Sequence, residues 1–87
     1  MDVYPMRLLD GEKQVPLWNV QLYLTPAEAS ELVAALNKLL VDPEAKEHEH
    51  VLSRESGREI SVSLVTLTKL NDLSGYTPPE RKMFQEK

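Results

Sequence analysis

The sequence predicts an α+β fold in which one long helix covers one face of an antiparallel sheet of about four strands. Three observations support this prediction: a strand-like alternation from Leu17, a capped amphipathic segment from Thr25, and two strand-like segments around residues 55–58. The predicted order is strand, strand, helix, strand, strand. We expect residues 1–70 to form one compact domain and residues 71–87 to form a C-terminal tail that could carry a short docked helix.

Two strands are predicted before the helix. Residues 3–9 are expected to form an edge strand, because Pro5 cannot donate a hydrogen bond to a neighbouring strand. Asp10-Gly11 then marks a turn. Residues 17–25 alternate apolar and polar side chains, the pattern of a half-buried strand. Its apolar members are Trp18, Val20, Leu22 and Leu24.

The helix is predicted over residues 25–40. Thr25 is a favourable N-cap, Pro26 suits the first helical position, and Glu28 completes a capping box. Apolar residues then recur every three or four positions, which predicts one apolar stripe facing the sheet. The stripe consists of Ala29, Leu32, Val33, Leu36, Leu39 and Leu40.

The last two strands are predicted over residues 48–54 and 59–68. Ser56-Gly57 is expected to form a two-residue turn, which would place Val51 opposite Val62 on the core face. A proline-containing cap, "TPPE", follows and predicts a short C-terminal helix. Such a short helix is marginal alone, so it either docks on a surface or frays.

Composition and charge restrict the class of protein. The chain has 87 residues, a net charge of −4 and no cysteine, which excludes disulfides and thiolate chemistry and favours a cytoplasmic location. The basic residues form no cluster of the kind that neutralises phosphates, so we expect no nucleic-acid partner. No stretch approaches the roughly 20 apolar residues needed to span a bilayer, so we expect no membrane partner.

His48 and His50, within "EHEH", are the only histidines. On a strand, positions i and i+2 point the same way, so both imidazoles could approach one zinc or other divalent metal ion. A third ligand would have to come from Asp42, from Glu44 or from a second copy. The main interpretation is an exposed polar strand without a bound metal; a histidine-dependent or pH-sensitive contact is a further alternative.

An apolar outer patch is predicted on the sheet face that carries the histidines. It would consist of Tyr23, Val65 and Leu67, and either the tail residues Met83 and Phe84 or another chain would cover it. An outer face that is half apolar therefore favours a homodimer or a protein partner.

Three classes of function remain open. The first is a small acidic interaction or regulatory module that acts as a homodimer, and it is the prediction we favour, without a cofactor. The second is a metal-binding or metal-responsive domain that uses His48 and His50. The third is a small enzyme with a site at a dimer interface, which we do not favour because the sequence has neither a nucleophile elbow nor a glycine-rich phosphate loop.

Overall fold

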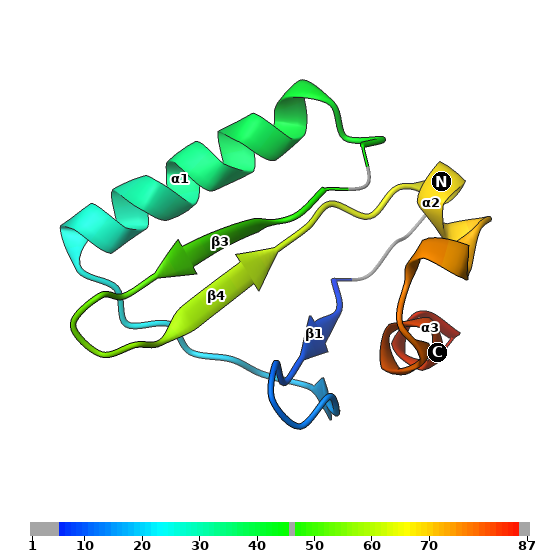
Figure 1. The fold of residues 1–87 in the computed structure, drawn as a ribbon, viewed down its shortest axis with the longest axis horizontal. Coiled ribbons are helices and arrows are strands. Elements are labelled where there is room, and N and C mark those ends of the chain that lie inside the picture. Colours follow the sequence, from blue (N-terminus) through cyan, green and yellow to red (C-terminus); the bar gives the residue numbers. More distant parts are fainter. Residues whose placement is uncertain (1–5, 46, 86–87) are drawn as a thin grey trace. The chain divides into compact units, whose positions relative to one another are not determined.

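The computed structural model describes residues 6–45 and 47–85, and it confirms an α+β architecture with one long helix and antiparallel strand pairs (Figure 1). The four-stranded sheet is not confirmed, because the described strands form two separate pairs, β1 with β2 and β3 with β4. The described residues form two compact units. One is Tyr23–Val65, and the other joins the residues up to Leu22 to those from Thr66.

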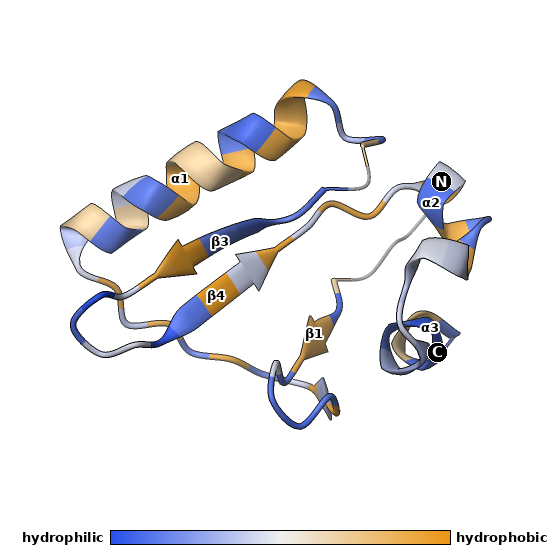
Figure 2. Ribbon diagram, in the orientation of Figure 1, coloured by the Kyte–Doolittle hydropathy of each residue, from blue (hydrophilic) through white to orange (hydrophobic). Residues whose placement is uncertain are grey.

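The unit Tyr23–Val65 contains the long helix α1, Pro26–Val41, and the hairpin of β3, Glu49–Leu52, and β4, Glu59–Val62. Figure 1 shows α1 lying along this hairpin, and β3 makes most of the contact with it. Apolar residues recur along the whole helix and on both strands (Figure 2). Burial of these side chains against each other holds the unit together.

The predicted capping box of α1 is confirmed. The Glu28 amide donates to Thr25 Oγ1 at 3.2 Å, and the Thr25 amide donates to Glu28 Oε1 at 3.0 Å. The Thr25 amide is the main cause that lowers the pKa of Glu28, and a hydrogen bond with the Ser53 side chain lowers it further. Glu28 therefore satisfies the start of α1 and also joins it to the end of β3.

The hairpin register is two residues away from the predicted one. Val51 pairs with Ile60, and His50 pairs with Ser61. The Ser53 amide donates to the Arg58 carbonyl at 2.8 Å, so the connection has four residues, 54–57, where a two-residue turn was predicted. Side chains alternate with a period of two, so a two-residue shift leaves every side chain on its predicted face. Val51 accordingly lies on the buried face, where it is 4% exposed.

The second unit contains a short hairpin and three helical segments. β1, Leu8–Leu9, pairs with β2, Pro16–Leu17, around the predicted turn, in which Asp10 accepts from two backbone amides. α2, Leu67–Leu70, is followed by a 3₁₀ turn, Leu73–Gly75, and by α3, Pro78–Gln85. The predicted C-terminal helix is thus confirmed, and its Thr77–Glu80 capping box is present. The Arg7 guanidinium donates to the Met83 carbonyl at 3.3 Å, which ties α3 to the start of the chain.

All four predicted strands are shorter than expected, and β3 covers only Glu49–Leu52 of the predicted residues 48–54. Of the strand predicted over residues 3–9, residues 3–5 lie outside the described residues and Leu8–Leu9 is paired. The segment from Trp18 to Thr25 has no strand partner among the described residues, although its side chains alternate. β4 ends at Val62, opposite the first residue of β3, because β3 offers no further partner. Leu67, predicted to lie in this strand, begins α2 instead, and the Thr66 side chain caps that helix.

No helix among the described residues is both long and apolar enough to cross a membrane.

The capping carboxylate of Glu28 predicts that the stability of the protein depends on pH. Folding favours the charged form of Glu28, whose pKa is held below its ordinary value of 4.5. Its contribution to stability is therefore complete above that value and is lost as the pH falls through the lowered folded-state pKa. Glu28→Gln keeps a capping acceptor and should remove this part of the acid destabilisation, whereas Glu31→Gln, one turn from the cap, should not. Urea unfolding between pH 3 and 7 measures the difference, and equal pH profiles for the two variants would contradict it.

Substitution of two turn glycines, Gly57 and Gly11, is predicted to lower the free energy of unfolding by different amounts. Gly57 has φ 71°, in the left-handed region, although a Cβ there would meet no atom within 4 Å. Gly57→Ala should therefore cost about 1 kcal/mol from backbone strain, and Gly57→Asn should cost less. Gly11 also has open space around it and no positive φ, so Gly11→Ala serves as the control and should change stability by less than about 0.5 kcal/mol. Urea unfolding at neutral pH measures these values.

Candidate functional site

The two histidines lie side by side on the hairpin face that does not meet α1. Their ring centroids are 4.7 Å apart, with an angle of 89° between the ring planes. His50 lies on β3, and its neighbour Val51 points to the buried face. Both histidines are exposed, as predicted: strand alternation places them on one common face, and the burial of Val51 on the other face makes theirs the outer one.

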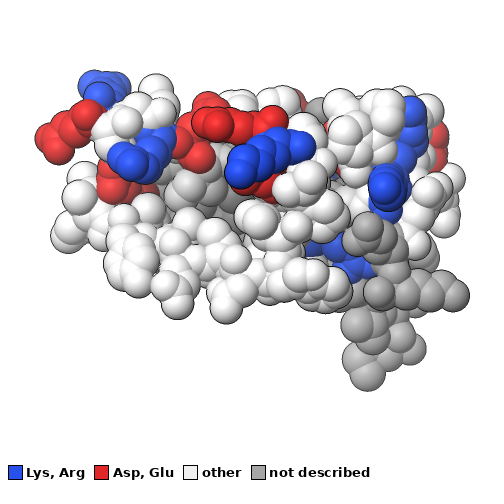
Figure 3. Space-filling view, turned by 90° about the horizontal axis from the view of Figure 1, so that it is seen from below, with Lys and Arg blue, Asp and Glu red and all other residues white. Residues whose placement is uncertain are grey.

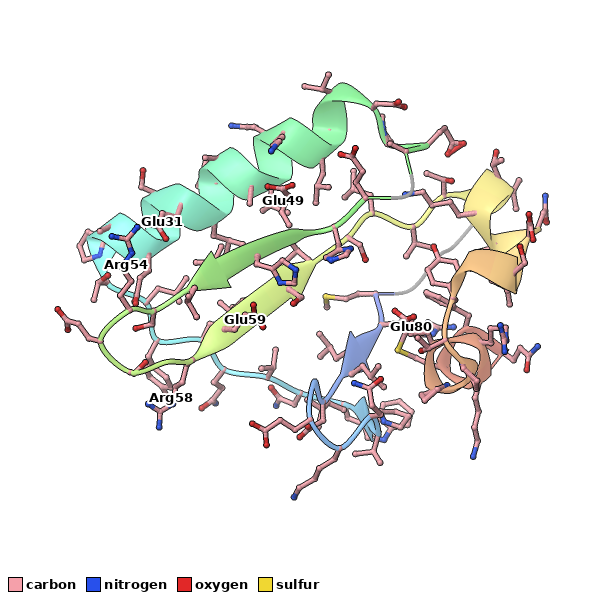
Figure 4. All side chains as sticks on the ribbon, in the orientation of Figure 1. Glu31, Glu49, Arg54, Arg58, Glu59 and Glu80 are labelled. Atoms are coloured by element: carbon pink, nitrogen blue, oxygen red, sulfur yellow. The ribbon has the colours of Figure 1, made fainter. Side chains whose placement is uncertain are left out.

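The ring of His50 has two oxygen neighbours from β4. Its Nδ1 atom lies 2.8 Å from Ser61 Oγ and 3.2 Å from Glu59 Oε2. Ser61 lies directly opposite His50 in the hairpin, and Glu59 lies two positions earlier on the same face. Figure 4 shows Glu59 at β4, the second strand of the hairpin. The carboxylate stabilises a proton on Nδ1, because an unprotonated nitrogen would present its lone pair to a negative charge.

No third metal ligand joins the histidine pair within the described part of the chain. No group of three histidine or acidic side chains there is placed to hold a metal ion. Neither Asp42, which is the C-cap of α1, nor Glu44 forms such a group with the two histidines. A metal role for His48 and His50 stays a prediction that depends on ligands from outside this set.

The predicted interface residues fall into both units. In the unit Tyr23–Val65, the side chain of Tyr23 is 87% exposed, and Val65 is half-buried beyond the end of β4. In the other unit, Leu67 is 49% exposed, Met83 is buried, and Phe84 packs against Tyr76 with ring centroids 4.8 Å apart. Val65 and Leu67 were grouped because both were predicted to lie on one continuous strand over residues 59–68. β4 ends at Val62, so this strand does not extend to either residue. Their role at an interface stays a prediction.

α1 carries two parallel rows of apolar side chains. The buried row, Leu32, Ala35 and Leu39, belongs to the side that packs on the hairpin, where Ala35 and Leu39 are 7% and 6% exposed. The exposed row consists of Val33, Leu36 and Leu40. Each of its members follows a member of the buried row by one position, so the two rows are rotated by about 100° around the helix axis. The exposed fractions of Val33, Leu36 and Leu40 are 58%, 37% and 58%.

The charged side chains in the middle of α1 avoid the exposed row. Glu31 and Lys38 each precede a member of the buried row by one position, so they lie roughly 160° from the exposed row around the helix. Lys38 is directed to the hairpin, where its Nζ lies 3.6 Å from Glu49 Oε1. Ser30 and Asn37 border the exposed row and are uncharged. Figure 3 shows the face seen from below in Figure 1, on which acidic and basic side chains lie next to one another with uncharged side chains beside them.

The exposed row was missed in the sequence, where six apolar positions of the helix were assigned to one buried stripe. The width of that stripe was the signal that could have identified it. The six positions span about 120° of the helix circumference, and Ala35, which is buried but was not assigned to the stripe, widens the apolar face to about 160°. A two-stranded hairpin covers less than that, so one side of the stripe is left without a partner.

A groove of about 370 Å³ lies between β2 and α3 in the other unit. Its lining is largely apolar and proline-rich, and Lys82 is the one ionisable side chain among the described residues that line it. The lining residues are Gln14, Val15, Pro16, Pro78, Pro79, Lys82 and Met83.

Comparisons of the chain with protein-family models, with curated proteins and with solved structures give no match.

The two rows of α1 predict stability losses of different size for the same substitution at adjacent positions. Leu39→Ala removes a side chain that is 6% exposed and should lower the free energy of unfolding by about 2–4 kcal/mol. Leu40→Ala removes one that is 58% exposed and should change it by less than about 1 kcal/mol at low protein concentration. Urea unfolding followed by circular dichroism measures both. Equal losses would show that the two side chains are equally buried in solution.

Proposed function

We propose that the protein is a non-enzymatic interaction module that works as a homodimer, with the exposed row of α1 at the centre of the dimer interface. The observation that supports this most directly is the continuous apolar row Val33, Leu36 and Leu40 on a helix whose Glu31 and Lys38 lie on the other side. Spacings of three and four residues are those of a helix–helix seam, in which such side chains interlock with a second helix.

A small core supports the need for a partner. In the unit Tyr23–Val65, the buried apolar residues among those described are Ala35, Leu39 and Val51. The single core of so small a unit rarely supplies more than about 3–5 kcal/mol, so burial of further apolar surface by association would add appreciably to its stability. The chain has no cysteine, so association of the exposed row is an effective way to bury further apolar surface.

The lack of charge along the exposed row permits a second copy of the chain as the occupant. Two copies with a net charge of −4 each repel one another, and they associate most readily through surface that carries no charge. The exposed row and its neighbours Ser30 and Asn37 provide such a surface. A twofold axis that crosses α1 near Leu36 would place the row against its own copy, in antiparallel helices, and so bury both rows together.

The dimer interface is tested with charges placed on and beside the exposed row. Leu40→Glu puts a carboxylate into the seam and should shift the protein to monomer, because the charge would lose its water in the dimer. Val41→Glu, at the next position and 85% exposed, is the matched control and should leave the dimer intact. Sedimentation velocity from low to high micromolar concentration, with native mass spectrometry, measures the oligomeric state.

Each outcome of this experiment decides the proposal. A concentration-dependent dimer that Leu40→Glu abolishes and Val41→Glu retains would support it. A wild-type monomer at high micromolar concentration would overturn it. A monomer in which Leu40→Glu also unfolds the protein would show that the row is covered within its own chain. Equal weakening by both variants would show that net charge matters and that the row does not.

A further inference from the structure

The outer face of the hairpin holds a second candidate surface, which is independent of α1. His48 and His50 share this face, and the buried face of the same strand packs on the helix. The distance between their rings can be compared with the geometry of a bound metal ion. Two imidazoles that ligate one ion at about 2.0–2.1 Å, at angles between square and tetrahedral, have ring centres roughly 4.5–5 Å apart. The observed separation of 4.7 Å lies in this range, but with 89° between the ring planes it is equally that of an ordinary edge-to-face pair, so the argument for a metal depends on the contacts of His50.

The surroundings of His50 select the nitrogen that can bind a metal ion. Glu59 Oε2 lies 3.2 Å from Nδ1 and favours the tautomer in which Nδ1 carries the proton. Ser61 Oγ, at 2.8 Å from the same atom, limits rotation of the ring. The lone pair then resides on Nε2. Histidines that ligate metals characteristically have this arrangement, with the other ring nitrogen donating to a carboxylate.

We propose that His48 and His50 form an open two-histidine site for a divalent transition-metal ion, with Glu59 as the residue that positions His50. Neutral imidazole suits Zn²⁺, Ni²⁺ and Cu²⁺, with Cu²⁺ binding most tightly, and it does not suit Mg²⁺ or Ca²⁺. Because no group of three ligands forms among the described residues, water completes the coordination. The site is therefore exchangeable and weaker than a structural zinc site with four protein ligands.

The tautomer of His50 provides a test that needs no metal. Long-range ¹H–¹⁵N spectra of the metal-free protein at pH 7.5 should show His50 protonated on Nδ1, and Glu59→Gln should reduce this preference. On addition of Zn²⁺, the Nε2 resonance of His50 should show the shift of a coordinated nitrogen. A His50 ring protonated on Nε2 in the metal-free protein would overturn the positioning role of Glu59.

Titration calorimetry with Zn²⁺, and with Mg²⁺ as the metal control, tests the site itself. His48→Ala and His50→Ala should each lower the Zn²⁺ affinity at least tenfold, and Glu59→Gln should lower it about 10–100-fold. Glu47→Gln is the matched control, because it removes a neighbouring acid and keeps both rings. Affinity that survives both alanine substitutions, or equal binding of Mg²⁺, would overturn the proposal. Circular dichroism checks that each variant is folded.

The failure of this proposal can be distinguished from the failure of the dimer. Leu40→Glu leaves both histidines in place, so a monomeric variant should bind Zn²⁺ with the affinity of the wild type. Conversely, His48→Ala and His50→Ala leave the exposed row of α1 intact and should not change the metal-free oligomeric state. Zn²⁺ binding that is lost in Leu40→Glu would show that a second copy supplies a ligand and would overturn the assignment of an open site completed by water.

Discussion

The unit around α1 depends on one constraint, which is that the apolar face of the helix is wider than the hairpin that it covers. Leu39 and Val51 illustrate the part of the face that is satisfied, since both are almost fully buried between helix and strand. Leu40, at the next helical position, is rotated out of this contact by about 100° and is mostly exposed. The same sequence pattern that folds the unit therefore also leaves it with apolar surface that favours association.

Charge strengthens this division of the helix into two sides. Lys38 pairs with Glu49 at the hairpin side, and Glu28 is held by the backbone of its own cap and by Ser53. These interactions are partly or fully exposed to water, so each contributes little to the free energy of folding. Their larger effect is on the orientation of the helix. If α1 rotated about its axis, charged side chains such as Lys38 would be pressed against the hairpin and lose their water. The observed orientation, which keeps charges away from the exposed row, is therefore favoured.

Elements that depend on residues close together in the sequence, such as capped helices, were predicted correctly. Elements that depend on pairing with a distant segment, such as strands, were predicted only in part. The cap at Thr25 and the cap at Thr77 involve residues three apart, and both helices are present. Trp18 and its neighbours alternate as a strand does, but a strand also needs a partner with free hydrogen-bonding groups, which no local pattern supplies. The histidine face was predictable because alternation survives a two-residue shift of register. The contacts of His50 with Glu59 and Ser61 were not, because they depend on that register.

The two proposed surfaces are energetically separate because the hairpin lies between them. α1 packs on the face that carries Val51, whereas His50 projects from the opposite face of the same strand. A ligand on one surface can change the affinity of the other surface for its own partner only if the hairpin has two conformations to which that ligand binds with different affinity. The close packing of Val51 against the helix opposes a change in the backbone of β3, and the pairing with β4 fixes the position of His50. Binding at the histidines and association through α1 should therefore be nearly additive, with little coupling free energy between them.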